Sequence, residues 1–237
     1  MSKHYFAVQQ AERSADVYIF GDIVPWEFWE GEVSANGLVG RISALDADTI
    51  NVHIDSYGGA VSEGWAIYNA LMAHPAKIVT WGDGFVASAA LFPFLAGEER
   101  YASTLSAYYL HEVMTCADGY ARDLRAAADE IETMTQIGVG AFTARTHLNA
   151  DEVLALMAAE TWLSPDAALE AGIATAIVPD ASPRHMQSMK RQFVQRFIGQ
   201  KPPEKPEDKL PEDKLPEDKP SGIIQLFSGL FDGQKGK

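Results

Sequence analysis

Two kinds of hydrophobic pattern alternate along the first 180 residues of the chain. Short β-branched and aromatic runs bounded by glycine or polar residues predict strands, and apolar residues spaced three or four positions apart predict amphipathic helices. Strands are expected at residues 17–20, 50–54, 77–81 and 107–110, and helices at residues 31–45, 61–74, 87–95, 119–147, 149–158 and 165–171. This alternation predicts an α/β fold with crossover connections.

Local start and stop signals refine these boundaries. Gly82 and Gly84 are expected to end the strand that precedes them. Pro93 removes a helical hydrogen bond and should kink or shorten the helix in which it lies. Asn149 followed by Glu152 resembles a capping box, which predicts a helix that begins at this point.

The composition changes sharply near residue 200, which divides the chain into three parts. We expect a folded domain over residues 1–198, with its core at about 16–180, and a disordered linker over 199–221. The linker repeats Lys-Leu-Pro-Glu-Asp, and its prolines and mixed charges cannot build a core. Residues 222–237 form a short amphipathic segment, expected to dock on a partner through apolar positions at helical spacing. These positions are Ile223, Ile224, Leu226, Phe227, Leu230 and Phe231.

Charge and cysteine content narrow the function classes. The formal net charge of −14 over 237 residues disfavours a nucleic-acid partner, because phosphate binding depends on Lys and Arg. Cys116 is the only cysteine, so an intrachain disulfide and a multi-cysteine metal site are excluded, and neither metal nor cofactor is expected. Without an apolar run resembling a signal peptide or a membrane span, the chain is expected in the cytoplasm, away from membranes.

Candidate chemistry gathers at the ends of three predicted strands. Ser88 lies at a strand-to-helix turn, where free backbone N–H groups favour a developing oxyanion. Gly58 and Gly59 form a turn after another strand, where a backbone N–H can approach a substrate carbonyl. The N–H groups of Gly59 and Ala89 are therefore candidate oxyanion donors, and His111, at the end of a third strand, is a candidate general base.

The order of these motifs resembles the Clp peptidase family, ClpP. The resemblance covers about residues 16–179 and rests on the Gly-Gly turn, Gly-x-x-Ala-Ser, a strand-terminal His and an acidic residue before Leu-Ser-Pro. It implies a ClpP/crotonase-like fold of repeated strand-strand-helix units, with a long projecting helix that builds contacts between subunits. It also implies Ser88 as nucleophile, His111 as base, Glu160 as the third triad member, and rings of subunits, commonly sevenfold or stacked in pairs.

Within the family, the segment 159–163 (AETWL) is most similar to the head maturation proteases of tailed phages and prophages. That likeness implies a serine endopeptidase that cleaves scaffold or capsid-precursor proteins in the host cytoplasm or inside proheads. Two departures from the family stand out: Tyr57 replaces the usual proline before the glycine turn, and Glu160 replaces aspartate.

Several alternatives stay open at this level. Asp118 or Asp166 could serve as the triad acid instead of Glu160. The chain could also be a catalytically silent Clp-like scaffolding subunit that binds partners through its tail. A crotonase-type acyl-CoA enzyme would share the fold and the oxyanion glycines, but it would not need a Ser–His pair.

Overall fold

The structure, a computed structural model, describes residues 8–11, 13–25 and 35–179. The chain divides into two units, Met1–Gln192 and Phe193–Lys237. The second unit lies outside the described residues, as do the predicted linker at 199–221 and the amphipathic segment at 222–237. Those predictions therefore stay predictions, and the fold below is that of the first unit.

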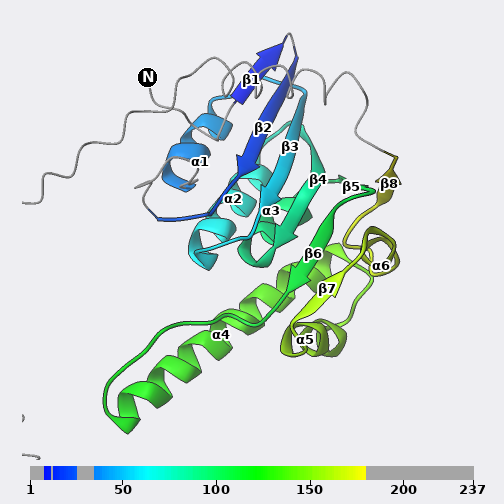
Figure 1. Ribbon diagram of the computed structural model, residues 1–237. Coiled ribbons are helices and arrows are strands. Elements are labelled where there is room, and N and C mark those ends of the chain that lie inside the picture. Colours follow the sequence, from blue (N-terminus) through cyan, green and yellow to red (C-terminus); the bar gives the residue numbers. More distant parts are fainter. Residues whose placement is uncertain (1–7, 12, 26–34, 180–237) are drawn as a thin grey trace, which may run out of the picture. The chain divides into compact units, whose positions relative to one another are not determined.

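The described residues form a mixed sheet of eight strands (Figure 1). The strands follow the order β1-β2-β3-β4-β5-β8, while β6 pairs with the far end of β4 and β7 pairs with β6. Every pairing is parallel except β1–β2 and β6–β7, as crossover connections require. The strands are β1 (Val8–Ala11), β2 (Ser14–Phe20), β3 (Thr49–Ser56), β4 (Lys77–Ala87), β5 (Glu99–Ser103), β6 (Ala107–Leu110), β7 (Thr161–Leu163) and β8 (Ala176–Val178).

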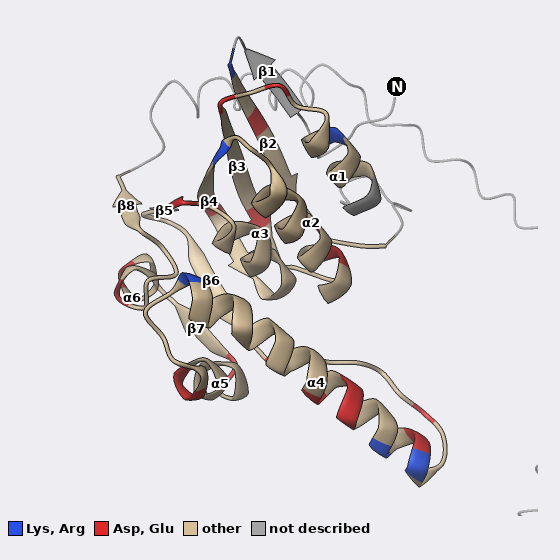
Figure 2. Cartoon of the chain, turned by 180° about the vertical axis from the view of Figure 1, so that it is seen from behind, with Lys and Arg blue, Asp and Glu red and all other residues tan. Residues whose placement is uncertain are grey.

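Helices cover one face of the sheet and extend beyond it. α1, α2 and α3 lie against the same face in both views, and α4 projects away from the body (Figures 1 and 2). The core between sheet and helices is apolar, with Val52, Ile54, Ile67 and Phe94 fully buried. The helices are α1 (Ala35–Ser43), α2 (Val61–Ala73), α3 (Leu91–Leu95), α4 (Ala121–Arg145), α5 (Ala150–Ala158) and α6 (Pro165–Glu170), with a short 3-10 helix, Ser88–Ala90, ahead of α3.

The predicted end of a strand at Gly82 and Gly84 is wrong, because β4 continues through both glycines to Ala87. Neighbouring strands explain why glycine stands at these positions. A Cβ on Gly82 would lie 2.4 Å from the Tyr108 hydroxyl, and one on Gly84 would lie 2.4 Å from the Asp55 carboxylate. Asp55 Oδ1 also accepts the Phe85 N–H at 3.0 Å, which holds the strand through its irregular stretch.

Two other local predictions are confirmed. Glu152 N–H donates to Asn149 Oδ1 at 3.0 Å and Asn149 N–H donates to Glu152 Oε2 at 2.8 Å, which is a capping box at the start of α5. The helix that contains Pro93 is short, with five α-helical residues after the 3-10 turn.

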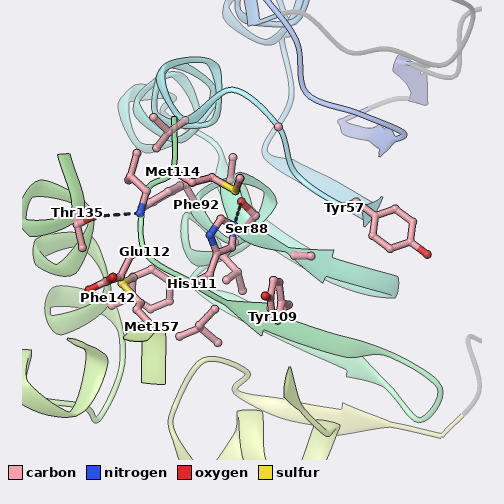
Figure 3. Close-up of a pocket in the computed structure, with 18 of the residues that line it drawn as sticks. Tyr57, Ser88, Phe92, Tyr109, His111, Glu112, Met114, Thr135, Phe142 and Met157 are labelled. Atoms are coloured by element: carbon pink, nitrogen blue, oxygen red, sulfur yellow. Dashed lines mark hydrogen bonds between the residues drawn. The ribbon is translucent and has the colours of Figure 1, made fainter. Parts of the chain in front are cut away.

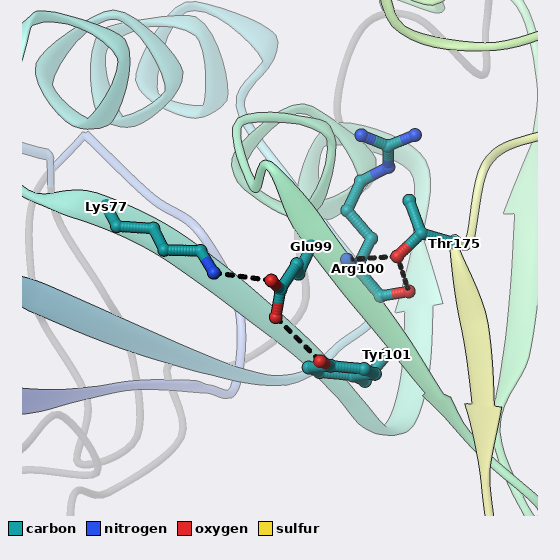
Figure 4. A network of polar contacts seen from close by, with 5 residues as sticks. All are labelled: Lys77, Glu99, Arg100, Tyr101 and Thr175. Carbon is teal, nitrogen blue, oxygen red and sulfur yellow. Dashed lines mark hydrogen bonds and ion pairs between the residues drawn. The ribbon is translucent and has the colours of Figure 1, made fainter.

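Strand β5 is fixed by polar contacts to both of its neighbours in the sheet (Figure 4). On one side, Glu99 pairs with Lys77 of β4 and accepts a hydrogen bond from Tyr101 at 2.6 Å. On the other, the Arg100 N–H donates to Thr175 Oγ1 at 2.7 Å, and that hydroxyl donates back to the Arg100 carbonyl at 3.1 Å. These bonds align β5 between β4 and β8.

The side chain of Arg100, which lies on β5, joins three segments of the chain. Its guanidinium is buried and donates at 2.7–2.9 Å to the carbonyls of Gly97, Arg145, Gly172 and Ile173. Burial lowers the pKa of Arg100 to about 10, because the charged form loses its hydration. The base of α4, where Arg145 lies, is thereby attached to the body of the domain.

Candidate active site

Ser88 lies in a strained turn immediately after β4. Its φ of +55° is in the left-handed region, which non-glycine residues rarely adopt. Among the described non-glycine residues, only Ser88 and Glu160 have a positive φ. Such strain costs about 1–3 kcal/mol and persists where surrounding structure holds it, most often at functional sites. Ser88 is also the first residue of the 3-10 helix, whose first N–H groups have no intrahelical acceptor.

His111 meets Ser88 because their strands are neighbours. β6 runs parallel to β4 with Ala87 opposite Tyr109, so the ends of both strands lie side by side. His111 Nε2 lies 2.7 Å from Ser88 Oγ (Figure 3). In the tautomer protonated at Nδ1, Nε2 accepts the serine proton, which is the arrangement of a nucleophile with its general base. The two residues chosen from the sequence are therefore in contact.

The Gly58–Gly59 turn packs directly against the Ser88 turn. A Cβ on Gly58 would lie 2.7 Å from Ser88 Cβ and 2.8 Å from Ala89 N, and a Cβ on Gly59 would lie 2.1 Å from the Ile23 carbonyl. The Gly58 N–H donates to Ser56 Oγ at 3.0 Å. Of the two glycine N–H groups, that of Gly59 is thus the candidate oxyanion donor, alongside that of Ala89.

The structure does not bring the Glu160 carboxylate into hydrogen bonding with His111. Glu160 is exposed, and its Oε2 lies 3.5 Å from the hydroxyl of Tyr109, whose ring contacts His111 at a centroid distance of 5.4 Å. Desolvation raises the pKa of Tyr109, and the negative charge of Glu160 raises it further. Within the part of the chain that the structure describes, His111 makes one side-chain hydrogen bond, to Ser88.

The alternative acids do not reach the histidine either. Asp118 is exposed in the loop before α4. Asp166 lies in the first turn of α6, where its negative charge interacts favourably with the positive end of the helix dipole. Neither hydrogen-bonds His111 within the described residues.

A largely apolar cavity of about 430 Å³ opens beside Ser88 (Figure 3). Its buried wall includes Phe92 of α3, Phe142 of α4 and Met157 of α5. Gly138 of α4 keeps the cavity open, since a Cβ there would lie 3.2 Å from the Phe92 ring. The segment after His111 passes along α4, where the Val113 N–H donates to Thr135 Oγ1 at 3.0 Å. The cavity's size and largely apolar lining are those of a pocket that binds an apolar group.

Of the aromatic residues around the site, the sequence analysis singled out Tyr57 but neither Tyr109 nor Trp162. Tyr57, Tyr109 and Trp162 all line the same cavity as Ser88. A strand alternates its faces, so the placing of Tyr109 on the same side as His111 was a signal available in the sequence. The approach of Trp162 was not, because it depends on the antiparallel pairing of β7 with β6.

The described residues contain no cluster of three or more His, Cys, Asp or Glu side chains that would hold a metal ion. None of the helices described is both long and apolar enough to cross a bilayer.

Comparison with known proteins decides the family. The family model described as Clp protease matches residues 31–181. The chain belongs to the Clp protease family. Membership of this family implies a serine-type peptidase. The match also confirms the resemblance to ClpP noted in the sequence.

Individual relatives agree with this assignment. The chain is 27% identical over 157 residues to ATP-dependent Clp protease proteolytic subunit 2 of Treponema pallidum, a match that covers 62% of this chain and 79% of the relative. It is 30% identical over 140 residues to the protein of the same name from Borreliella burgdorferi, covering 58% and 71%. Among solved structures, the fold is similar to that of a ClpP1 point mutant from Listeria monocytogenes. The TM-score is 0.60 at 23% identity, over 70% of this chain and 91% of that one. The predicted ClpP-like α/β fold is confirmed.

Proposed function

We propose that the chain is a serine endopeptidase that cleaves proteins through an acyl-enzyme, with Ser88 as nucleophile and His111 as general base. The observation that carries the proposal is the 2.7 Å contact between Ser88 Oγ and His111 Nε2, made at a strained turn beside an open cavity. A nucleophile and base within hydrogen-bonding reach are the first geometric requirement for this chemistry.

The reaction follows from the positions of these groups. Ser88 Oγ attacks the peptide carbonyl carbon while His111 Nε2 takes the hydroxyl proton. The carbonyl oxygen becomes an oxyanion and is stabilised by the N–H groups of Gly59 and Ala89. His111 then gives its proton to the departing nitrogen. In the second half of the reaction, water attacks the acyl carbon while His111 takes a proton from it, and His111 returns that proton to Ser88 Oγ as the acyl group leaves.

Glu160 is proposed as the group that orients His111. The side chain would turn from the Tyr109 hydroxyl to His111 Nδ1, since Tyr109 adjoins both residues. A hydrogen bond of 3.5 Å to an exposed carboxylate is weak, so little free energy opposes this movement. We propose that substrate binding or assembly of subunits brings the acid to the base.

The apolar cavity supports a preference for a large apolar residue on the acyl side of the scissile bond. The charged residue Glu112 lines the cavity, but it is exposed. The buried part of the cavity wall, formed by Phe92, Phe142 and Met157, offers no charged partner, so a Lys or Asp side chain placed against it would lose its hydration. A Leu, Met or Phe side chain would instead gain roughly 1.5–3 kcal/mol from burial.

Self-association into rings is proposed from the family and from the surface of α4. Leu124, Met134 and Ile137 are exposed apolar residues on this helix, and its tip carries both acidic and basic side chains (Figure 2). A projecting helix with exposed apolar side chains is a surface that a second subunit could bury. The sevenfold, stacked arrangement stays a prediction from the resemblance.

Phage prohead maturation is the proposed setting, and it rests on the segment 159–163 alone. Under this proposal the substrates are scaffold and capsid-precursor proteins. The relatives reported above are Clp protease proteolytic subunits, so they support proteolysis rather than this setting.

The Ser88–His111 contact also weighs against the two rival functions. A crotonase-type acyl-CoA enzyme would use the glycine turn without this pair, and a silent scaffolding subunit would have no reason to keep its nucleophile strained and paired.

Hydrolysis of an unfolded protein such as casein, by the wild type and by Ser88→Ala, tests the proposal. We expect activity in the wild type and a loss of roughly a thousandfold or more in the variant. Equal hydrolysis by both proteins would show a contaminating protease, and no hydrolysis by an assembled wild type would favour the scaffolding alternative.

A further inference from the structure

Four aromatic rings form a continuous row beside the Ser88–His111 pair. Tyr57 stacks on Phe85 at a centroid distance of 4.8 Å, Phe85 meets Trp162 edge-on at 5.6 Å, and Trp162 stacks on Tyr109 at 4.6 Å. We call these four residues the aromatic wall. Its last member, Tyr109, contacts the His111 ring at 5.4 Å, so the wall extends from the glycine turn to the proposed base.

Three of the four aromatic side chains of the wall are exposed to solvent. Tyr57 is 64% exposed, Trp162 49% and Phe85 38%. They come from three separate segments, namely the turn after β3, strand β4 and strand β7. Contiguous exposed aromatic surface of this kind marks a binding site more often than a chance arrangement does. Large aromatic residues at the mouth of a site also supply much of the free energy of binding.

The side of the scissile bond that faces the wall follows from the chemistry of His111. In the proposed reaction, the base gives its proton to the departing nitrogen, so the leaving half of the substrate must lie next to the imidazole. Tyr57, Tyr109 and Trp162 of the wall line the same cavity as Phe92, Phe142 and Met157. Within it, Tyr57 and Tyr109 lie on one side of the Ser88–His111 pair and Phe142 and Met157 on the other (Figure 3), with Tyr109 against the His111 ring. The two sides therefore offer places for the residues after and before the scissile bond.

We propose that the aromatic wall binds the first residues after the scissile bond and selects a large apolar or aromatic side chain there. This inference rests on the proposed function, because it uses the proton transfer from His111. The rings already pack on one another in stacked and edge-on pairs, and a further ring extends that packing with the same geometry.

Tyr57 gives this chain part of its specificity under the proposal. The segment 56–59 is a Ser-Tyr-Gly-Gly turn, and its tyrosine both begins the wall and lines the cavity that holds Ser88. The tyrosine ring stands where the Clp family usually has the small, rigid side chain of proline, at a position that we propose faces the substrate. Tyr57 and Trp162 are thus the specificity-determining residues that we assign.

The test uses two internally quenched peptides that share Leu before the scissile bond and carry Phe or Ala after it. We expect the full-length wild type to prefer the Phe peptide by about tenfold in kcat/KM, mainly through KM, which is the size expected for one aromatic contact. Trp162→Ala should bring the ratio of the two rates near one, and Trp162→Phe should restore most of it. The matched control is Leu105→Ala, which removes an 87% exposed apolar residue in the β5–β6 turn and should leave the ratio at its wild-type value.

Three outcomes would overturn the inference. One is a Trp162→Ala variant that cleaves both peptides more slowly by the same factor, which indicates a structural role. A second is a wild type that cleaves the Ala peptide as fast as the Phe peptide or faster. The third is a change of oligomeric mass in Trp162→Ala, which assigns the wall to a contact between subunits. Covalent labelling of Ser88 by a small alkyl fluorophosphonate is measured on the wild type in parallel, because its absence refutes the proposed function instead of the wall.

Discussion

Gly58 and Ser88 lie so close across two turns that a Cβ on the glycine would be 2.7 Å from the Cβ of the serine. The same Cβ would lie 2.6 Å from the Ala87 carbonyl, and the φ of Gly58 is +94°. Both the space and the backbone conformation therefore require glycine. The two turns fit together as one unit, and the oxyanion donors and the nucleophile depend on each other's position.

Gly58→Ala tests this interdependence. The added methyl group must push the Ser88 turn away, so we expect kcat/KM for a peptide to fall by roughly a hundredfold, the size of effect seen when an oxyanion donor is lost. The control is Gly40→Ala on α1, where a Cβ meets nothing within 4 Å. Equal activity in the two variants would contradict the packing described for Gly58, and circular dichroism confirms that both are folded.

Substitutions of Glu160 and Tyr109 test whether Glu160 acts by orienting His111 or through its contact with Tyr109. If Glu160 orients His111, Glu160→Gln should lower kcat about a hundredfold or more. Tyr109→Phe removes only the weak 3.5 Å hydrogen bond to the carboxylate, so it should leave kcat within about twofold of the wild-type value. Single-turnover kinetics measures both. A fall in kcat by the same factor in the two variants would show that the Tyr109–Glu160 contact is itself the functional arrangement.

Gly138→Val tests the cavity as the binding site for the residue before the scissile bond. The new side chain would occupy space next to Phe92, where a Cβ alone comes within 3.2 Å of the ring. We expect the preference to shift from Phe towards Ala at that substrate position, measured as a ratio of kcat/KM values. Gly140→Val, on the same helix with nothing within 4 Å, should keep the wild-type preference. An unchanged ratio of the kcat/KM values for Phe and Ala in Gly138→Val would show that the residue before the scissile bond does not bind in this cavity.

Arg100→Met should destabilise the fold. The carbonyls of Arg145, Gly172 and Ile173 lose their donor, while that of Gly97 keeps a hydrogen bond from Arg145 Nη2, and the loss costs roughly 2–4 kcal/mol of unfolding free energy. Arg122→Met is the control, because that side chain is 81% exposed and its pairing with Asp123 contributes little. Urea denaturation of both variants gives the comparison, and similar midpoints would refute the role assigned to Arg100.

The polar contacts that hold β5 should be sensitive to acid. The hydrogen bond from Lys77, with a smaller effect of the Tyr101 hydroxyl, lowers the pKa of Glu99 below its ordinary 4.5. The folded state therefore favours the carboxylate, and the resulting stabilisation is present above pH 4.5 and is lost as the pH falls through the lowered pKa. Glu99→Gln should have a lower urea midpoint than the wild type at pH 7, and the gap should close in acid. A gap that persists at low pH would contradict this assignment.

The pairing of Ser88 with His111 could be predicted because their motifs stand in the order of the Clp family. Their positions after predicted strands made each a candidate but did not show that they meet. The predicted strand end at Gly82 and Gly84 was wrong. Glycine is required there by Tyr108 and Asp55, which come from other strands and could not be identified as neighbours from the sequence. The contact of Glu160 with Tyr109 could not be predicted for a similar reason. It depends on the pairing of three-residue β7 with β6, for which the local pattern carries almost no signal.

The central claim is that Ser88 is an activated nucleophile. Its most direct test is covalent labelling of the assembled wild type with a fluorophosphonate probe, with Ser88→Ala and His111→Ala beside it and the modified peptide identified by mass spectrometry. We expect one labelled residue, Ser88, with no labelling in the first variant and much slower labelling in the second. An intact wild type that takes up no label, or one labelled equally in Ser88→Ala, would contradict the claim.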